Sequence, residues 1–163
     1  MDRYEGYDAV VFDLDGTVVH LDVDWARVDE ETADILESHG YQPTETAWGA
    51  LDAADGDAAA AVTALLADHE RRGAERSWRL PAADDLRALA DAGRPTAVCS
   101  LNCEAAVRVA LTEHGLTDAA DAVVGRDTVG SRKPDPGRYS RRSGRPVSRR
   151  SVPCSSATPS RTS

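Results

Sequence analysis

Lysine is almost missing from this sequence of 163 residues, because 18 of its 19 basic residues are arginine and only Lys133 is not. No apolar run is long enough to cross a bilayer. Acidic residues number 28, which gives a net charge of −9. This excess of negative charge disfavours nucleic acid or an anionic membrane as the main partner. The bias toward Ala, Asp and Arg suggests a GC-rich genome. The acidity suits a halophile, with an ordinary acidic bacterial protein as the alternative.

Cysteine is scarce too, and its three positions, Cys99, Cys103 and Cys154, show no pairing that suits a disulfide framework or a zinc site. The N-terminal stretch MDRYEGYD is polar and acidic, unlike a signal peptide. We therefore expect a cytoplasmic protein with reduced thiols. The sequence leaves the oligomeric state open.

Short apolar runs alternate with segments of helical periodicity. Strands are predicted at 9–12, 96–100 and 121–125, and helices at 25–38, 57–72, 81–93 and 102–115. Asn102 is a plausible N-cap of the last helix. The segment between the first two helices, rich in Asp and Gly, is expected to be a loop. Strands alternating with helices predict an α/β fold with a Rossmann-like parallel sheet.

Two carboxylates follow the first strand directly, in the string VVFDLDGT. If the backbone stays extended, Asp13 and Asp15 point to the same side at the carboxyl end of the strand, where open α/β sheets bind ligands. Paired carboxylates there suit Mg²⁺, and a carboxylate can also act as a nucleophile. An acidic helix N-cap is the plainer alternative for an isolated DxD.

The whole string is more specific than its two acids. It resembles the opening motif of the haloacid dehalogenase superfamily, DxDGT after an apolar strand. The resemblance implies that Asp13 is a nucleophile forming an aspartyl-phosphate, and that Asp15 is the general acid and base. Both would hold Mg²⁺, Asp15 through its backbone carbonyl. Because dehalogenase members lack the second acid, Asp15 points to phosphoryl transfer.

Later segments are similar to further motifs of that superfamily. Ser100 ends the strand TAVC, where the family has a Ser or Thr that binds the phosphoryl group. Lys133, in SRKPDP, stands where the family has a cation that offsets phosphoryl charge. The resemblance implies that Thr17 and Asn102 also contact substrate. A strand-end cap at Ser100 and a solvated lysine at position 133 are the plainer alternatives.

The resemblance also implies a division into domains. Residues 1–17 and 81–137 would form an incomplete core, and 18–80 a helical cap that closes over the site and excludes water. The three tryptophans, Trp25, Trp48 and Trp78, fall in this insert, and we expect them to pack in its core rather than to contact substrate.

Composition changes sharply after Gly137. Residues 138–163 contain seven Arg, eight Ser and no acidic residue, and we expect this tail to be disordered. The family's last motif, an apolar strand followed by GDxxxD, is missing. With synonymous codons and a shifted frame, residues 151–162 can encode Arg-Ala-Leu-Phe-Val-Gly-Asp-Ser-Val-Ser-Asp. This favours a frame disruption near residue 137 over a genuine basic tail that binds a polyanion.

Together these features predict Mg²⁺-dependent hydrolysis of a small phosphorylated metabolite, with the activity of the chain as written in question. A phosphomutase of the same family is one alternative. A non-catalytic truncated remnant, or a polyanion-binding protein that uses the basic tail, is another.

The frame hypothesis makes a prediction about the DNA. Read in the alternative frame after about codon 137, it should encode a helix-period apolar pattern, then FVGD, and should continue past codon 163. Resequencing this region tests the point. An early stop, or the absence of GDxxxD, would make the basic tail a genuine feature of the protein.

Overall fold

The computed structural model describes residue 4 and residues 6–128, so Lys133 and the predicted disordered tail lie outside the described residues. In chain order the elements are β1 (Val10–Phe12), β2 (Val19–His20), α1 (Trp25–Ser38), α2 (Ala47–Ala53), α3 (Gly56–Glu75), β3 (Trp78–Arg79), α4 (Ala82–Asp91), β4 (Thr96–Cys99), α5 (Glu104–Glu113), the 3₁₀ turn η1 (Thr117–Ala119) and β5 (Ala122–Val124).

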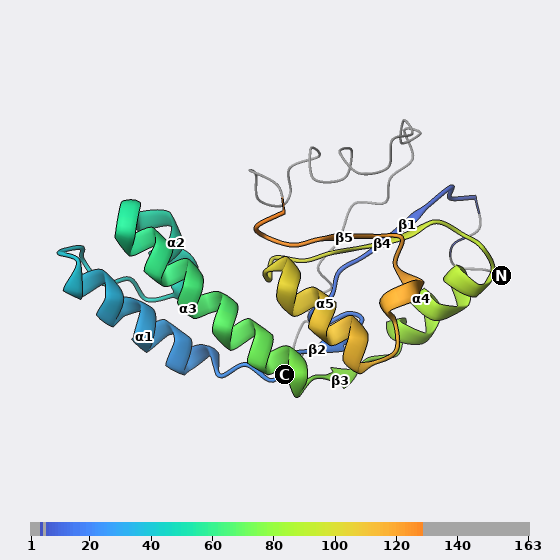
Figure 1. Cartoon of the computed structure of the whole chain (residues 1–163), viewed down its shortest axis with the longest axis horizontal. Helices are drawn as coiled ribbons and strands as arrows, with labels where there is room; N and C mark the ends of the chain where they lie inside the picture. The colour runs from blue at the N-terminus through green and yellow to red at the C-terminus, as the bar shows by residue number, and fades with distance from the viewer. Residues whose placement is uncertain (1–3, 5, 129–163) are drawn as a thin grey trace, which may run out of the picture.

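The main sheet consists of β1, β4 and β5 in that spatial order, and both strand pairs are parallel. The connecting helices α4 and α5 lie on the same side of the sheet (Figure 1). Right-handed crossovers require this when successive connections move in one direction across a sheet. The predicted α/β fold with a parallel sheet is therefore confirmed.

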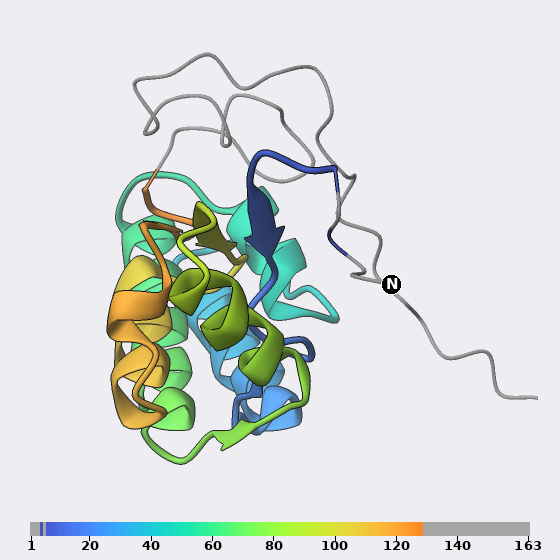
Figure 2. The same cartoon turned by 90° about the vertical axis from the view of Figure 1, so that its right-hand side faces the viewer.

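The insert between β1 and β4 carries α1, α2 and α3, which share a hydrophobic cluster of their own. Every fourth residue is buried on each long helix: Val28, Thr32 and Leu36 on α1, and Ala58, Val62 and Leu66 on α3. This spacing is the sequence signal that predicts both helices. Both views place α3 alongside α5 of the core (Figures 1 and 2).

The predicted loop between α1 and α3 contains a short helix, α2, which the sequence interpretation missed. It begins where the side chain of Thr46 accepts a hydrogen bond from the N–H of Gly49, at 3.1 Å. Seven residues are too few for the apolar periodicity that reveals a helix in a sequence.

A two-stranded antiparallel ribbon, β2 with β3, joins the two ends of the insert to the core and was also not predicted. Trp78 on β3 is 50% exposed, and the centre of its ring lies 4.5 Å from the centre of the His20 ring on β2. The expectation that all three tryptophans pack in the insert's core is therefore wrong for Trp78. Trp25 does pack against the insert's cluster.

No helix among the described residues is both long enough and apolar enough to span a membrane.

Candidate functional site

The chain turns sharply straight after β1. The carbonyl oxygen of Leu14, which is fully buried, accepts hydrogen bonds from the N–H groups of Thr17, Val18 and Val19 at 3.2, 2.9 and 3.0 Å. Gly16 has a φ of +76°, a conformation that disfavours residues with a side chain. This turn leaves Asp13 half-buried at the carboxyl end of β1.

The turn also corrects the expectation that Asp13 and Asp15 share an extended backbone. Asp15 lies inside the turn, and its Oδ1 accepts a hydrogen bond from the N–H of Leu21 at 2.9 Å. The same oxygen is 3.8 Å from Nδ1 of His20. The Asp15 carboxylate is therefore held toward the segment that leads into the insert.

Ser100 lies at the same end of the sheet as Asp13. Phe12 pairs with Val98 across the parallel strands, so the residues that follow β1 and β4 emerge next to each other. Ser100 is only 2% exposed, and its N–H donates to the carbonyl of Val124 on β5 at 2.9 Å. The structure thus brings Asp13, Asp15 and Ser100 to the carboxyl ends of neighbouring strands.

Asn102 is not the N-cap of α5, as the sequence suggested, because the helix begins at Glu104 and Cys103 is the capping residue. Asn102 is instead 4% exposed, and its Nδ2 has no hydrogen-bond partner among the residues that the structure describes. Its backbone N–H donates to Oγ of Ser100 at 3.1 Å. A buried amide donor without a partner is costly, which makes it a candidate for binding a ligand or a water.

The structure says less about the two remaining predicted site residues, Thr17 and Lys133. Thr17 is half-buried within the turn after β1. Lys133 lies outside the described residues, so its place relative to Asp13 stays a prediction.

Mg²⁺ prefers an octahedral set of oxygen ligands, and a carboxylate from Asp13 with a carbonyl from Asp15 fits that preference by type. Within residues 6–128 and residue 4, no group of three or more His, Cys, Asp or Glu side chains is placed to hold a metal ion. Asp13 and Asp15 alone would therefore supply only part of the ligand set that Mg²⁺ prefers. The other acidic ligands implied by the resemblance belong to the missing GDxxxD motif.

A buried ion pair lies next to the turn that carries Ser100 and Asn102, and the sequence interpretation missed it. It joins Glu70 of α3 to Arg126, two residues after β5. A signal was present in the sequence: the apolar stripe of α3 continues to position 70, where a glutamate stands. A charged residue at a core position of a helix indicates a specific partner.

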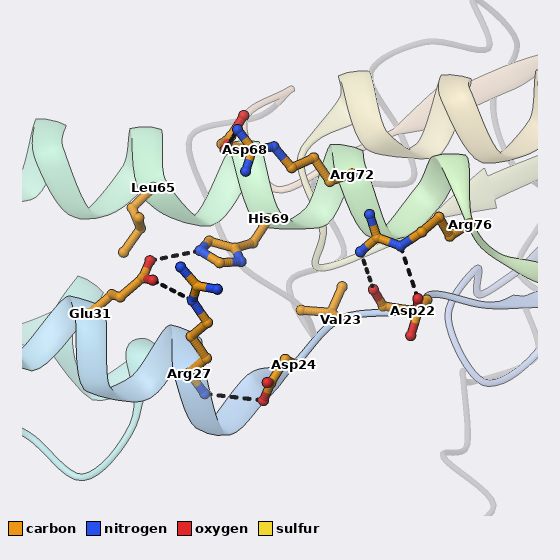
Figure 3. A pocket seen from close by; sticks show the side chains of 10 residues that line it. All are labelled: Asp22, Val23, Asp24, Arg27, Glu31, Leu65, Asp68, His69, Arg72 and Arg76. Atoms are coloured by element: carbon orange, nitrogen blue, oxygen red, sulfur yellow. Dashed lines mark hydrogen bonds and ion pairs between the residues drawn. The ribbon is translucent and has the colours of Figure 1, made fainter.

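A separate pocket of about 350 Å³ opens between α1 and α3 (Figure 3). Glu31 accepts a hydrogen bond from Arg27 Nε at 2.6 Å and lies 2.8 Å from His69 Nε2. These two partners, Arg27 first, lower the pKa of Glu31. Arg76 Nε donates to Asp22 at 2.9 Å. The lining consists of Asp22, Val23, Asp24, Arg27, Glu31, Leu65, Asp68, His69, Arg72 and Arg76. None of the predicted site residues is among them.

No protein-family model and no curated protein sequence matches this chain. Solved structures do match. A haloacid dehalogenase-like hydrolase from Bacteroides fragilis is 20% identical with a TM-score of 0.57, and the match covers 82% of this chain and 70% of that one. A predicted phosphoglycolate phosphatase from Haemophilus somnus 129pt is 19% identical with a TM-score of 0.55, covering 82% and 68%.

A third match is a mutant of CbbY from Rhodobacter sphaeroides in complex with xylulose-1,5-bisphosphate. It is 18% identical with a TM-score of 0.51, and the match covers 82% of this chain and 69% of that one. At these identities the likeness establishes the fold. The chain has the fold of haloacid dehalogenase-like hydrolases, so the fold implied by the sequence resemblance is confirmed.

The reactivity of Cys103, which follows Asn102, tests whether this part of the chain is buried. Burial raises the pKa of the Cys103 thiol to about 11, so at pH 8 its thiolate fraction is about a hundredfold lower than for an ordinary thiol near pKa 9. We expect iodoacetamide to label Cys103 at least that much more slowly in the folded chain than in urea, as measured on its peptide by mass spectrometry. Equal rates in both states would contradict this burial.

Proposed function

We propose that this protein hydrolyses a small phosphate monoester through an aspartyl-phosphate intermediate. The observation that supports the proposal is the placement of Asp13 and Ser100 directly after adjacent parallel strands, with Asp15 in the turn that follows β1, on the fold of haloacid dehalogenase-like hydrolases. Open α/β sheets bind ligands at this edge.

Each group has a defined task in this reaction. A carboxylate oxygen of Asp13 attacks phosphorus, and the bond from phosphorus to the ester oxygen breaks. Asp15 gives its proton to that departing oxygen and becomes a carboxylate. A water then attacks the phosphorus of the aspartyl-phosphate while Asp15 takes its proton. Inorganic phosphate leaves, Asp13 is regenerated as a carboxylate, and Asp15 is protonated again.

Ser100 and Asn102 are proposed to bind the phosphoryl oxygens. Both are buried, and Nδ2 of Asn102, which has no partner within the described part of the chain, is a hydrogen-bond donor that suits an anionic oxygen. Thr17, in the turn after Asp13, and Lys133 are assigned the same task by resemblance. A cation and several donors are needed because the transferring group develops negative charge on its oxygens.

Mg²⁺ is the proposed cofactor, held by the carboxylate of Asp13 and the backbone carbonyl of Asp15. When bound, it would neutralise charge between the nucleophile and the phosphoryl group. Among residues 4 and 6–128, no third acidic side chain is placed with these two to complete the site, so we expect weak Mg²⁺ affinity unless the alternative frame is restored.

The insert, residues 18–80, is proposed to act as a cap over a core formed by 1–17 and 81–137. The hydrophobic cluster shared by α1, α2 and α3 supports this division, although Val18, Val19, Leu21 and Ala74 at the ends of the insert belong to the core cluster. Phosphoglycolate or a sugar phosphate is the proposed substrate class, in line with the names of two structural neighbours. Cytoplasmic location, and the absence of nucleic acid or membrane partners, remain expectations from composition.

Two alternative functions are each supported by a specific observation. A phosphomutase would use the same aspartates and would transfer the phosphoryl group back to a substrate instead of to water. A non-catalytic remnant, or a polyanion-binding protein, would account for the missing acidic motif and the basic residues after 137. A magnesium-dependent phosphatase assay on the chain as written, beside its frame-restored form, separates these alternatives.

Replacing the nucleophile should abolish the reaction. In the frame-restored chain, Asp13→Asn should show no hydrolysis of phosphate esters and no acid-stable, hydroxylamine-sensitive phosphoprotein, because an amide oxygen is a poor nucleophile. Asp34→Asn, an exposed carboxylate on α1, is the matched control and should retain activity. Near-normal turnover by Asp13→Asn would end this mechanism.

Replacing Asp15 should depend on the leaving group. Asp15→Asn keeps an oxygen that can accept the hydrogen bond from Leu21, so the turn should persist. The variant should lose about 10²–10⁴-fold in kcat on alkyl phosphates, whose departing oxygen needs a proton, and much less on p-nitrophenyl phosphate. Equal losses on both substrates would show that Asp15 only shapes the site.

A further inference from the structure

The buried pair of Glu70 and Arg126 has close, two-point geometry. The Glu70 side chain is 0% exposed and the Arg126 side chain 8%. Oε1 of Glu70 lies 2.5 Å from Nη1 of Arg126, and Oε2 lies 3.2 Å from Nη2. Glu70 belongs to the insert and Arg126 to the core, so the pair crosses the boundary between them.

Both partners also bind the backbone of one short turn. Oε2 of Glu70 accepts a hydrogen bond from the N–H of Cys103 at 2.8 Å. Arg126 donates through Nη1 to the carbonyl of Leu101 at 3.0 Å and through its backbone N–H to the carbonyl of Asn102 at 2.8 Å. The side chains of the ion pair thus hold Leu101 and Cys103, and the backbone of Arg126 holds Asn102 between them.

A second element of the insert contacts the same cation. The guanidinium carbon of Arg126 lies 5.7 Å from the centre of the Trp48 ring, on α2. A cation placed over an aromatic face is stabilised, and more so when it is shielded from water. Arg126 therefore connects the turn to α2 as well as to α3.

Stability alone does not explain a charged pair at this position. Burying two charges costs desolvation energy, and replacing such a pair with apolar residues of similar size is often neutral or stabilising. A leucine at position 70 would continue the stripe formed by Ala58, Val62 and Leu66. What apolar side chains cannot supply are the two hydrogen bonds that Glu70 and Arg126 make to the N–H of Cys103 and the carbonyl of Leu101.

We propose that Glu70 and Arg126 are positioning residues that fix the turn from Ser100 to Cys103, and with it the side chains that receive the phosphoryl group. The assignment rests on the proposed function for its consequence, phosphate binding, but the fixing of the turn stands on geometry alone. Because Glu70 and Trp48 come from the insert, the phosphate-binding turn takes its shape from the helices above it.

The test compares single variants with an apolar double variant of the full chain. Glu70→Gln or Arg126→Gln alone leaves the other partner without its full charge pairing, so each should lower the unfolding temperature. Glu70→Leu with Arg126→Met removes both charges, and its unfolding temperature should return to that of the parent or exceed it. Asp118→Asn, which removes an exposed partner of Arg87, is the control and should change little.

Amide hydrogen exchange measured by NMR then reports on the turn itself. In the stable double variant, the Cys103 amide should exchange at least about tenfold faster than in the parent, because it has lost its acceptor. The Leu116 amide, bonded to the Leu111 carbonyl elsewhere in the core, should be unchanged. Titration with inorganic phosphate and Mg²⁺ should show about tenfold weaker binding in the double variant, as expected when donors lose their alignment.

The outcomes separate the two claims. If the double variant regains stability and keeps both slow exchange at Cys103 and parental phosphate binding, the pair is only structural and the positioning role is overturned. If the parent binds no phosphate at all, the proposed function fails, and exchange at Cys103 still decides whether Glu70 and Arg126 fix the turn.

Discussion

The parallel pairing of β1 with β4 is the constraint on which the site depends. Val10 pairs with Thr96 and Phe12 with Val98, although the insert and α4 separate them in sequence. Closing so long a loop costs entropy, which the packing of the core has to offset. Buried residues from β1, α4, β4 and α5 share one hydrophobic cluster, and this cluster holds the pairing in register. A shift of one residue would turn the side chains of β1 to the opposite face.

Much of this arrangement is predictable from short patterns. The strands ending at Phe12 and Cys99 are marked by apolar runs that stop at polar residues, and the long helices by burial at every fourth position. The positions of Asp13 and Ser100 follow from these runs, because parallel strands present their carboxyl ends at one edge. Local signals suffice here because each element is defined by its own residues.

Features that depend on contacts made only after the chain has folded could not be predicted. The two-residue strands β2 and β3 have no pattern of their own, and they exist because Val19 and Arg79 are brought together by the insert. The orientation of Asp15 depends on the N–H of Leu21, which is presented only after the chain has turned. Glu70 interrupts an apolar stripe, and this indicates a partner but not that the partner is Arg126.

The insert is connected to the site at two places with different chemistry. At its beginning, Asp15 accepts a hydrogen bond from Leu21, so a site residue is held by the segment that leads into α1. Toward the end of α3, Glu70 holds the turn beyond Ser100 through Arg126 and Cys103. A movement of the insert would therefore displace both Asp15 and the turn that follows Ser100. Packing between α3 of the insert and α5 of the core also connects these two parts of the chain.

The start of α5 shows how the charges around the site are distributed. A helix N-terminus carries unpaired N–H groups and a partial positive charge, and it commonly receives an anion. Here two carboxylates occupy that place: Glu70 accepts from the N–H of Cys103, and Asp127 from the N–H of Glu104 at 2.7 Å. Gly125 lies so close to the Glu104 backbone that a Cβ would come within 2.2 Å of its nitrogen, which keeps Asp127 in reach. In the proposed function, recognition of a phosphoryl group therefore falls to residues before the helix, where Ser100 and Asn102 lie, and to cations outside α5.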